Sequence, residues 1–253
     1  DAMAALDDHN VDGIVLIGGF EGLLTAETFA STERPVALVP ATISNNVPGT
    51  ELSLGSDTAL NVIVDAVDRL KQSAVGSRDR VFVVEVMGRK CGFLATAGGL
   101  GAGAEIVYEH DPGITLARLE RDAEGLVQAY DAGRQVAIVL MADGASEAFS
   151  ANTLARVFVG ESGGRFDTRV CVLGHLQQGG RPSPADRLLA VRLVDRAVKH
   201  ATHGSGAVVV GVEHGLVITG PVADRLGQAD IANRRRKTPV HRRWSDVIEV
   251  LSH

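Results

Sequence analysis

Short runs of β-branched and other apolar residues alternate along this chain with longer stretches in which apolar residues recur every three or four positions. The runs are typical of buried strands in a parallel sheet, and the periodic stretches of amphipathic helices. The runs predict strands at 11–17, 36–39, 80–86, 104–108, 135–141, 168–173, 207–212 and 216–219. The periodic stretches predict helices at 54–74, 92–103, 115–132, 150–160 and 184–201, and a final helix containing Trp244 and Leu251.

This alternation predicts an α/β fold in which parallel sheets are flanked by helices on both faces. The helix from 184 has a clear start, because Ser183 is a good N-cap residue and Pro184 suits the first helical position. Residues 1–6 resemble the interior of a helix without a start signal, so we expect the chain to begin inside a larger protein.

Ligands of parallel sheets bind at loops that follow the carboxyl ends of strands. One such loop, residues 40–50, carries the polar side chains of Thr42, Ser44, Asn45 and Asn46. Their hydroxyl and amide groups need hydrogen-bond partners from a ligand, water or the backbone. The loop is therefore either the floor of a binding site or a turn rich in Asn and Pro.

Other loops that follow strands also carry backbone amides or side chains that suit ligand binding. The Gly18-Gly19 pair offers backbone amides to a phosphate or makes a tight strand-to-helix turn. His175 donates to a phosphate or sugar hydroxyl, or bonds to nearby backbone. Asp143 and Glu147 accept hydrogen bonds from sugar hydroxyls, or favour the start of a helix.

Three arginines have positions that suit phosphate binding. Arg80 starts a strand, Arg89 follows one, and Arg169 precedes the histidine loop. Their planar guanidinium groups suit bidentate contacts to phosphate, on one rim or with a neighbouring subunit. The alternative for each is a surface ion pair.

Composition narrows the class of protein. The 253 residues are 45% hydrophobic and carry a net charge of −6, which supports a large buried core and gives no reason to expect nucleic acid. The basic residues 234–237 and Arg242-Arg243 form a solvated face or a site. Cys91 and Cys171 lack metal-ligand spacing and are expected to be reduced thiols. With no long apolar span, we expect a cytoplasmic protein that does not bind membranes.

The residues missing from these loops are also informative. A kinase needs a carboxylate to accept the proton of the attacking hydroxyl, and usually another to hold Mg²⁺. The central loop has Ser44 and two asparagines, and Phe20 follows the glycine pair. These groups suit binding of a sugar phosphate but not its activation. The alternative is an active kinase in which Asp57 or Glu51 acts as a rearranged base. Both residues also suit the start of the following helix.

Four motifs together resemble 6-phosphofructokinases. They are Gly18-Gly19, Thr42-Ile43-Ser44-Asn45-Asn46, residues 84–92 (VEVMGRKCG) and residues 173–180 (LGHLQQGG), in the order of that family. Catalytic members of the family have Thr-Ile-Asp-Asn-Asp in the second motif and an aspartate after the glycine pair. The Ser-Asn-Asn-Val-Pro-Gly-Thr of this chain looks like the carboxyl-terminal half of the duplicated eukaryotic enzymes, in which the old fructose 6-phosphate site binds fructose 2,6-bisphosphate.

The resemblance implies a sugar-phosphate site and no catalytic or metal-binding residue in this chain. The implied contacts are Ser44, Asn45, Asn46, Val47, Pro48, Arg80, Met87, Gly88, Arg89, Asp143, Arg169, His175, Leu176, Gln177 and Gln178. Arg80 and Arg169 match phosphate-binding arginines, one of which acts across a subunit boundary. Asp143 replaces the family's usual glutamate, and Arg89 replaces the glycine of vertebrate effector halves. Lys237, beside Arg236, aligns with a further phosphate arginine.

The resemblance also implies two lobes, residues 1–55 with 176–228 and residues 56–175 with 229–253. The family's first strand and nucleotide loop lie upstream of residue 1. We therefore expect the regulatory half of an ATP-dependent 6-phosphofructokinase, binding a fructose bisphosphate or fructose 6-phosphate. ATP and Mg²⁺ would bind elsewhere in a parent enzyme that contains a catalytic half and forms a homo-oligomer. A half that binds nothing and only supports assembly is the alternative.

Overall fold

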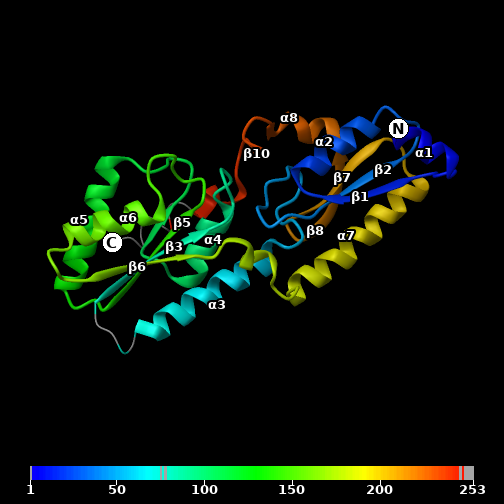
Figure 1. The fold of residues 1–253 in the computed structure, drawn as a ribbon. Helices are drawn as coiled ribbons and strands as arrows, with labels where there is room; N and C mark the ends of the chain where they lie inside the picture. Colours follow the sequence, from blue (N-terminus) through cyan, green and yellow to red (C-terminus); the bar gives the residue numbers. More distant parts are fainter. Residues whose placement is uncertain (1, 75, 77–78, 245–246, 248–253) are drawn as a thin grey trace. The chain divides into compact units, whose positions relative to one another are not determined.

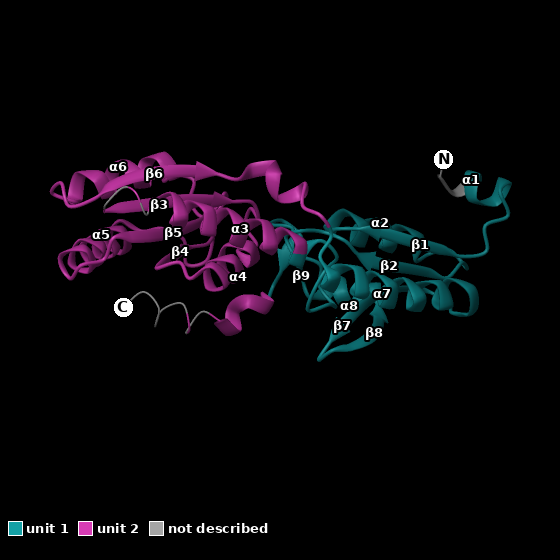
Figure 2. Cartoon of the chain, turned by 90° about the horizontal axis from the view of Figure 1, so that it is seen from below, with its two compact units in different colours: residues 1–57, 182–238 teal, residues 58–181, 239–253 magenta. Residues whose placement is uncertain are grey.

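The computed structural model describes residues 2–74, 76, 79–244 and 247. The chain divides into two compact units, residues 1–57 with 182–238 and residues 58–181 with 239–253 (Figure 2). Each unit is an α/β structure built around its own four-stranded sheet (Figure 1). No described helix is both long and apolar enough to cross a membrane.

The sheet of unit 1 has the order β1-β2-β7-β8. Its strands are β1 (Ile14–Gly18), β2 (Val36–Pro40), β7 (Ala207–Glu213) and β8 (Leu216–Pro221). The first three are parallel, as predicted, but β8 is antiparallel to β7. The general expectation of parallel strands was wrong for β8, because a short turn joins β7 to β8 and a parallel pair would need a long crossover.

Helices cover both faces of this sheet. The helices of unit 1 are α1 (Ala2–Asp8), α2 (Phe20–Phe29), α7 (Pro184–His203) and α8 (Val222–Gly227). Alternate residues of β2 point to opposite faces: Val36 and Leu38 pack with α2 and α8, whereas Ala37 and Val39 pack with α7. The predicted start of α7 is confirmed, because Ser183 Oγ accepts a hydrogen bond from Asp186 N at 3.1 Å.

The sheet of unit 2 has the order β4-β5-β3-β6, and all its strands are parallel. They are β3 (Arg80–Val86), β4 (Ile106–Tyr108), β5 (Val136–Ala142) and β6 (Asp167–Val172). The longer helices are α3 (Ser56–Ala74), α4 (Phe93–Ala102), α5 (Leu116–Asp131) and α6 (Ala151–Glu161). Two 3₁₀ helices, η1 (Gly174–Gln178) and η2 (Val240–Trp244), complete the unit.

The small residues of α4 allow this helix to lie close to its neighbours. A Cβ added at Gly98 would lie 2.9 Å from Ile63 Cγ2, and one at Gly99 would lie 2.4 Å from Val107 Cγ2. The predicted final helix begins as η2, and its remainder around Leu251 lies outside the described residues.

The observed boundaries between the units differ from the expected ones. Residues 176–181 belong to unit 2, because the Gln177 side chain binds the backbone after β3. Residues 229–238 belong to unit 1, where Ala229 joins the core and the short strands β9 (Ala229–Asp230) and β10 (Arg235–Arg236) pair with each other.

Candidate functional site

The loop of residues 41–55 in unit 1 leaves β2 and returns beside it. Thr42 N donates to Leu54 O at 2.9 Å, and Leu54 N donates to Pro40 O at 2.9 Å. The loop also packs on β7, where Glu51 N donates to Val212 O at 2.7 Å. It is therefore tied to two strands of the sheet.

Asn45 organises the interior of this loop. Its side chain is 2% exposed, its Nδ2 donates to Glu51 O at 2.7 Å, and its Oδ1 accepts from Ser53 N at 2.9 Å. Its φ of +50° is in the left-handed region, which asparagine tolerates better than most residues. Asn45 holds the loop together, and its side chain is not open to a ligand.

The other predicted contacts of the loop differ in exposure. Val47 and Pro48 are buried, and Val47 is part of the core. Ser44 and Asn46 are half-buried. Asn46 Nδ2 donates to Arg234 O at 2.8 Å, whereas its buried Oδ1 has no hydrogen-bond partner among the residues that the structure describes. Asn46 is thus the one of these five whose side chain has an unsatisfied acceptor.

Carboxylates near the loop are committed to structural contacts. Glu51 Oε2 accepts from His214 N at 3.0 Å, and Asp57 Oδ2 accepts from Ser183 Oγ. Phe20 is 5% exposed and packs in the core, so an apolar side chain fills the position after the glycine pair. The described residues contain no group of three or more His, Cys, Asp or Glu side chains that could hold a metal ion.

In unit 2, the loops after β3 and β5 meet at the carboxyl edge of the sheet. Arg89 N donates to Asp143 Oδ1 at 2.5 Å, and Asp143 N donates to Val86 O at 2.8 Å. Gly144 is needed here, because an added Cβ would lie 2.4 Å from Arg89 O. The predicted residues Met87, Gly88, Arg89 and Asp143 are therefore brought together, and the Arg89 side chain is exposed.

Two acidic groups at this edge, Asp143 and Glu85, have raised pKa values. Burial raises the pKa of Asp143, although the amide of Arg89 opposes this shift. Burial and the charge of Asp143 raise the pKa of Glu85, against a hydrogen bond from the backbone of Ala151. Both carboxyl groups therefore keep a proton to a higher pH than they would in water.

The helix η1 follows β6 and carries four predicted contacts. Gln177 is buried: its Oε1 accepts from Met87 N at 3.3 Å and its Nε2 donates to Gly174 O at 3.0 Å. His175, Leu176 and Gln178 are exposed. His175 has no hydrogen bond or ion pair within the described residues, so the interpretation as a histidine bonded to nearby backbone was wrong.

The suggestion that three arginines share one rim was also wrong. Arg89 lies at the carboxyl edge, but Arg80 is the first residue of β3 and Arg169 pairs in register with Phe82. Six further residues of β3 lie between Arg80 and the carboxyl edge. Arg80 and Arg169 lie near the amino end of their strands, where Arg169 forms an ion pair with Asp167 at 2.6 Å.

The basic residues 234–237 make internal contacts. Arg234 pairs with Glu21 at 2.6 Å and Arg235 with Asp230 at 3.3 Å. Arg236 is 9% exposed and donates to Thr50 O, and Lys237 Nζ donates to Gly227 O at 2.8 Å. These contacts fasten the segment after α8, while the side chains of Arg234 and Lys237 stay exposed.

Sequence reasoning missed the structural roles of Asn45 and Gln177. Amides were interpreted as ligand contacts because their residue type suits a polar site, but burial decides which groups they bind. The residue type of Asn45 could have been a signal, since asparagine is common in tight turns and tolerates the left-handed backbone that it adopts here. No comparable signal marks Gln177.

Comparisons with known proteins all identify the same family. The phosphofructokinase family model matches residues 1–201. The chain is 37% identical to an ATP-dependent 6-phosphofructokinase of Aspergillus niger, over 95% of this chain and 34% of that protein. It is 38% identical to the human platelet-type ATP-dependent 6-phosphofructokinase, over 89% of this chain and 32% of that protein.

Solved structures agree with this comparison. The phosphofructokinase of Saccharomyces cerevisiae superposes with a TM-score of 0.92 at 32% identity, covering 98% of this chain and 36% of that one. The chain thus spans about a third of the length of these relatives. The predicted α/β class with parallel sheets flanked by helices is confirmed, and the chain belongs to the phosphofructokinase family.

Proposed function

We propose that this chain is part of an ATP-dependent 6-phosphofructokinase and serves as its regulatory half, binding a fructose bisphosphate without phosphorylating it. The names of its relatives support the parent activity, the conversion of fructose 6-phosphate to fructose 1,6-bisphosphate in glycolysis. ATP and Mg²⁺ would be bound by other parts of the parent enzyme, which we expect to be an oligomer in the cytoplasm.

The observation that carries this proposal is the absence of an available carboxylate in the loop of residues 41–55. Positions 44 and 46, where catalytic relatives of this type have acids, are Ser44 and Asn46. The nearby carboxylates of Glu51 and Asp57 already accept hydrogen bonds. Proton transfer from an attacking hydroxyl needs a base within hydrogen-bond reach. The loop therefore favours binding over catalysis.

Groups that suit a sugar bisphosphate are kept. The exposed Arg89, His175 and Gln178 supply donors for phosphate and hydroxyl oxygens. The exposed Arg169, near the amino end of its strand, would supply donors to a ligand of a neighbouring subunit. We propose the contacts that the family resemblance implies, with three exceptions. The buried side chains of Asn45, Val47 and Gln177 would support neighbouring groups instead of touching the ligand.

Calorimetry with fructose 2,6-bisphosphate on the full-length protein tests the binding. We expect Arg169→Ala to weaken binding about tenfold or more, because a charge-assisted hydrogen bond contributes roughly 1.5–3 kcal/mol. Arg165→Ala is the matched control, since Arg165 is also exposed and paired, with Asp131 at 2.5 Å, and is not a proposed contact. Equal affinity of wild type and Arg169→Ala would contradict the assigned site.

Titrations with fructose 6-phosphate and fructose 1,6-bisphosphate would identify the preferred ligand. If none of these compounds binds or raises the Tm while the chain still assembles with its partners, the alternative of a purely structural half is supported instead.

A turnover assay tests whether the chain has kinase activity. We expect no transfer of phosphate from ATP to fructose 6-phosphate by the purified chain, because no carboxylate of the loop is available as a base. A coupled assay with a catalytically active relative as the positive control measures this. Appreciable turnover that disappears in Asp57→Asn would show that Asp57 acts as a rearranged base.

A further inference from the structure

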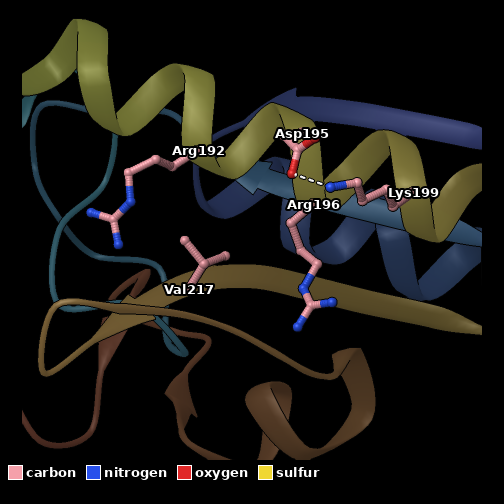
Figure 3. Close-up of a pocket in the computed structure, with 5 residues that line it drawn as sticks. All are labelled: Arg192, Asp195, Arg196, Lys199 and Val217. Atoms are coloured by element: carbon pink, nitrogen blue, oxygen red, sulfur yellow. Dashed lines mark hydrogen bonds and ion pairs between the residues drawn. The ribbon is translucent and has the colours of Figure 1, made fainter.

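A groove of about 250 Å³ lies in unit 1 between α7 and β8, and none of the residues proposed above as a contact lines it (Figure 3). It is lined by Arg192, Asp195, Arg196, Lys199 and Val217. The four charged residues are exposed. The chain as a whole has a net charge of −6, so a groove with three cations and one carboxylate is a local reversal of charge.

The helix brings these cations to one side. Residues four apart on a helix are neighbours on its surface, so Arg192 and Arg196 project together. Figure 3 shows both guanidinium groups extending from α7 toward β8, one on each side of Val217. Arg192 is fixed there, because its Nη2 donates to Gly215 O in the turn between β7 and β8. Its other nitrogens remain for a further acceptor.

The one carboxylate of the groove does not neutralise these arginines. Asp195 Oδ2 accepts from Lys199 Nζ at 2.7 Å, and this pair lies on the helix beside the groove (Figure 3). Arg196 has neither an ion pair nor a hydrogen bond within the described residues. The lining therefore carries a formal charge of +2, and both uncompensated charges are guanidinium groups.

Val217 supplies an apolar floor between the two charges. It is half-buried and packs against the core beneath α7. A hydrated inorganic ion gains nothing from contact with an apolar side chain, whereas the carbon atoms of an organic molecule can pack against it. A phosphate group offers three oxygens, which suit forked donors better than a single carboxylate does.

We infer that this groove binds a small organic phosphate, with the phosphate held by Arg192 and Arg196 and the organic part against Val217. The ligand class follows from two unneutralised guanidinium groups beside an apolar side chain. The site is distinct from the sugar-bisphosphate contacts proposed above, none of which lies on α7 or β8.

Calorimetry on the full chain at constant ionic strength tests this inference with inorganic phosphate, glycerol 3-phosphate and a nucleoside monophosphate. We expect both organic phosphates to bind more tightly than inorganic phosphate, and Arg196→Gln to weaken them about tenfold. The better of the two organic compounds indicates the source of the phosphate. Arg187→Gln is the matched control, because Arg187 is an exposed arginine of the same helix outside the groove.

Hydrogen exchange places the binding within the chain. Glycerol 3-phosphate should slow exchange at residues 213–219 in the wild type and not in Arg196→Gln. The double variant Arg192→Gln/Arg196→Gln should keep its affinity for fructose 2,6-bisphosphate. The inference would be overturned if wild type and Arg196→Gln bound the organic phosphates equally, or if exchange slowed only outside residues 213–219. Binding of an acidic peptide in place of the phosphates would also overturn it.

Discussion

At the scale of single residues, burial decides which polar groups of the loop at 41–55 hold the fold and which are open to a ligand. Asn45 and Ser44 are neighbours of similar polarity, yet Asn45 is 2% exposed and bonded on both sides of its amide while Ser44 is half-buried. Residue type alone does not separate these two roles.

Replacing Asn45 by alanine should therefore destabilise unit 1. Asn45→Ala leaves the part-buried Glu51 O and the buried Ser53 N without their partner, and each such loss costs about 1–3 kcal/mol. We expect a loss of about 2–4 kcal/mol, measured by urea denaturation. Asn152→Ala on the exposed face of α6 should change stability by about 0.5 kcal/mol or less, and an equal effect of both substitutions would contradict the role of Asn45.

Glu85 gives a pH-dependent prediction. Its raised pKa means that the folded state holds a proton more tightly than the unfolded chain. This contribution to stability is complete below the ordinary value of 4.5 and is lost as the pH rises through the folded pKa. Glu85→Gln, which keeps the acceptor for the Ala151 amide, should raise the Tm by about 1–2 °C at pH 7 and leave it unchanged near pH 3.5.

Scanning calorimetry at both pH values measures this difference. Glu124→Gln, on the exposed face of α5, serves as the control and should have little effect at either pH. A gain for Glu85→Gln that is the same at pH 3.5 and pH 7 would exclude the proposed charge effect.

At the scale of elements, alanine substitutions at two glycines of α4 distinguish the effect of close packing on stability from the effect of helix propensity. Gly99→Ala places a Cβ 2.4 Å from Val107 Cγ2 on β4, and this overpacking should cost about 1–3 kcal/mol. Gly101→Ala meets Val64 Cγ2 at an ordinary 3.5 Å and should stabilise the helix by about 0.5–1 kcal/mol. Thermal unfolding of the two variants should shift in opposite directions, and a stabilised Gly99→Ala would contradict the close contact.

Most elements could be predicted from the sequence, because a buried strand needs a continuous apolar run and a covered helix needs an apolar stripe. The run at 80–86 became β3 with the same bounds, and Ser183-Pro184 marked the start of α7. The short β9 and β10 have no such signal, since two paired residues do not make a period.

The relative places of the candidate residues were harder to predict. Arg80 and Arg89 are nine positions apart, but one opens β3 and the other follows its end, so the strand places them at opposite edges. The family motifs identified which residues to inspect. Register and burial, which depend on distant strands, decided what each of them contacts.

At the scale of the whole molecule, unit 1 is built from two segments and unit 2 contains one long continuous segment. Residues 58–181 include all four strands of the unit 2 sheet, whereas residues 1–57 lack β7, β8 and α7. We expect a fragment of residues 58–181 to fold alone, with reduced stability because it lacks His241, which binds Glu109 at 2.8 Å.

Circular dichroism and NMR of both fragments test this prediction. Residues 1–57 should remain unfolded, because the apolar faces of β2 have no partner strand or helix on one side. A disordered 58–181 fragment, or a folded 1–57 fragment, would show that the two sheets do not form independently.

The pairing of β2 with β7 also has a consequence during synthesis. Val36 pairs with Ala207, so the ribosome must translate the whole sheet of unit 2 before the sheet of unit 1 can close. At roughly 5–20 residues per second, β2 waits on the order of 10–30 s for its neighbour. The apolar residues of β2 are synthesised long before those of β7. They stay exposed in the nascent chain over that interval, where chaperones would recognise them.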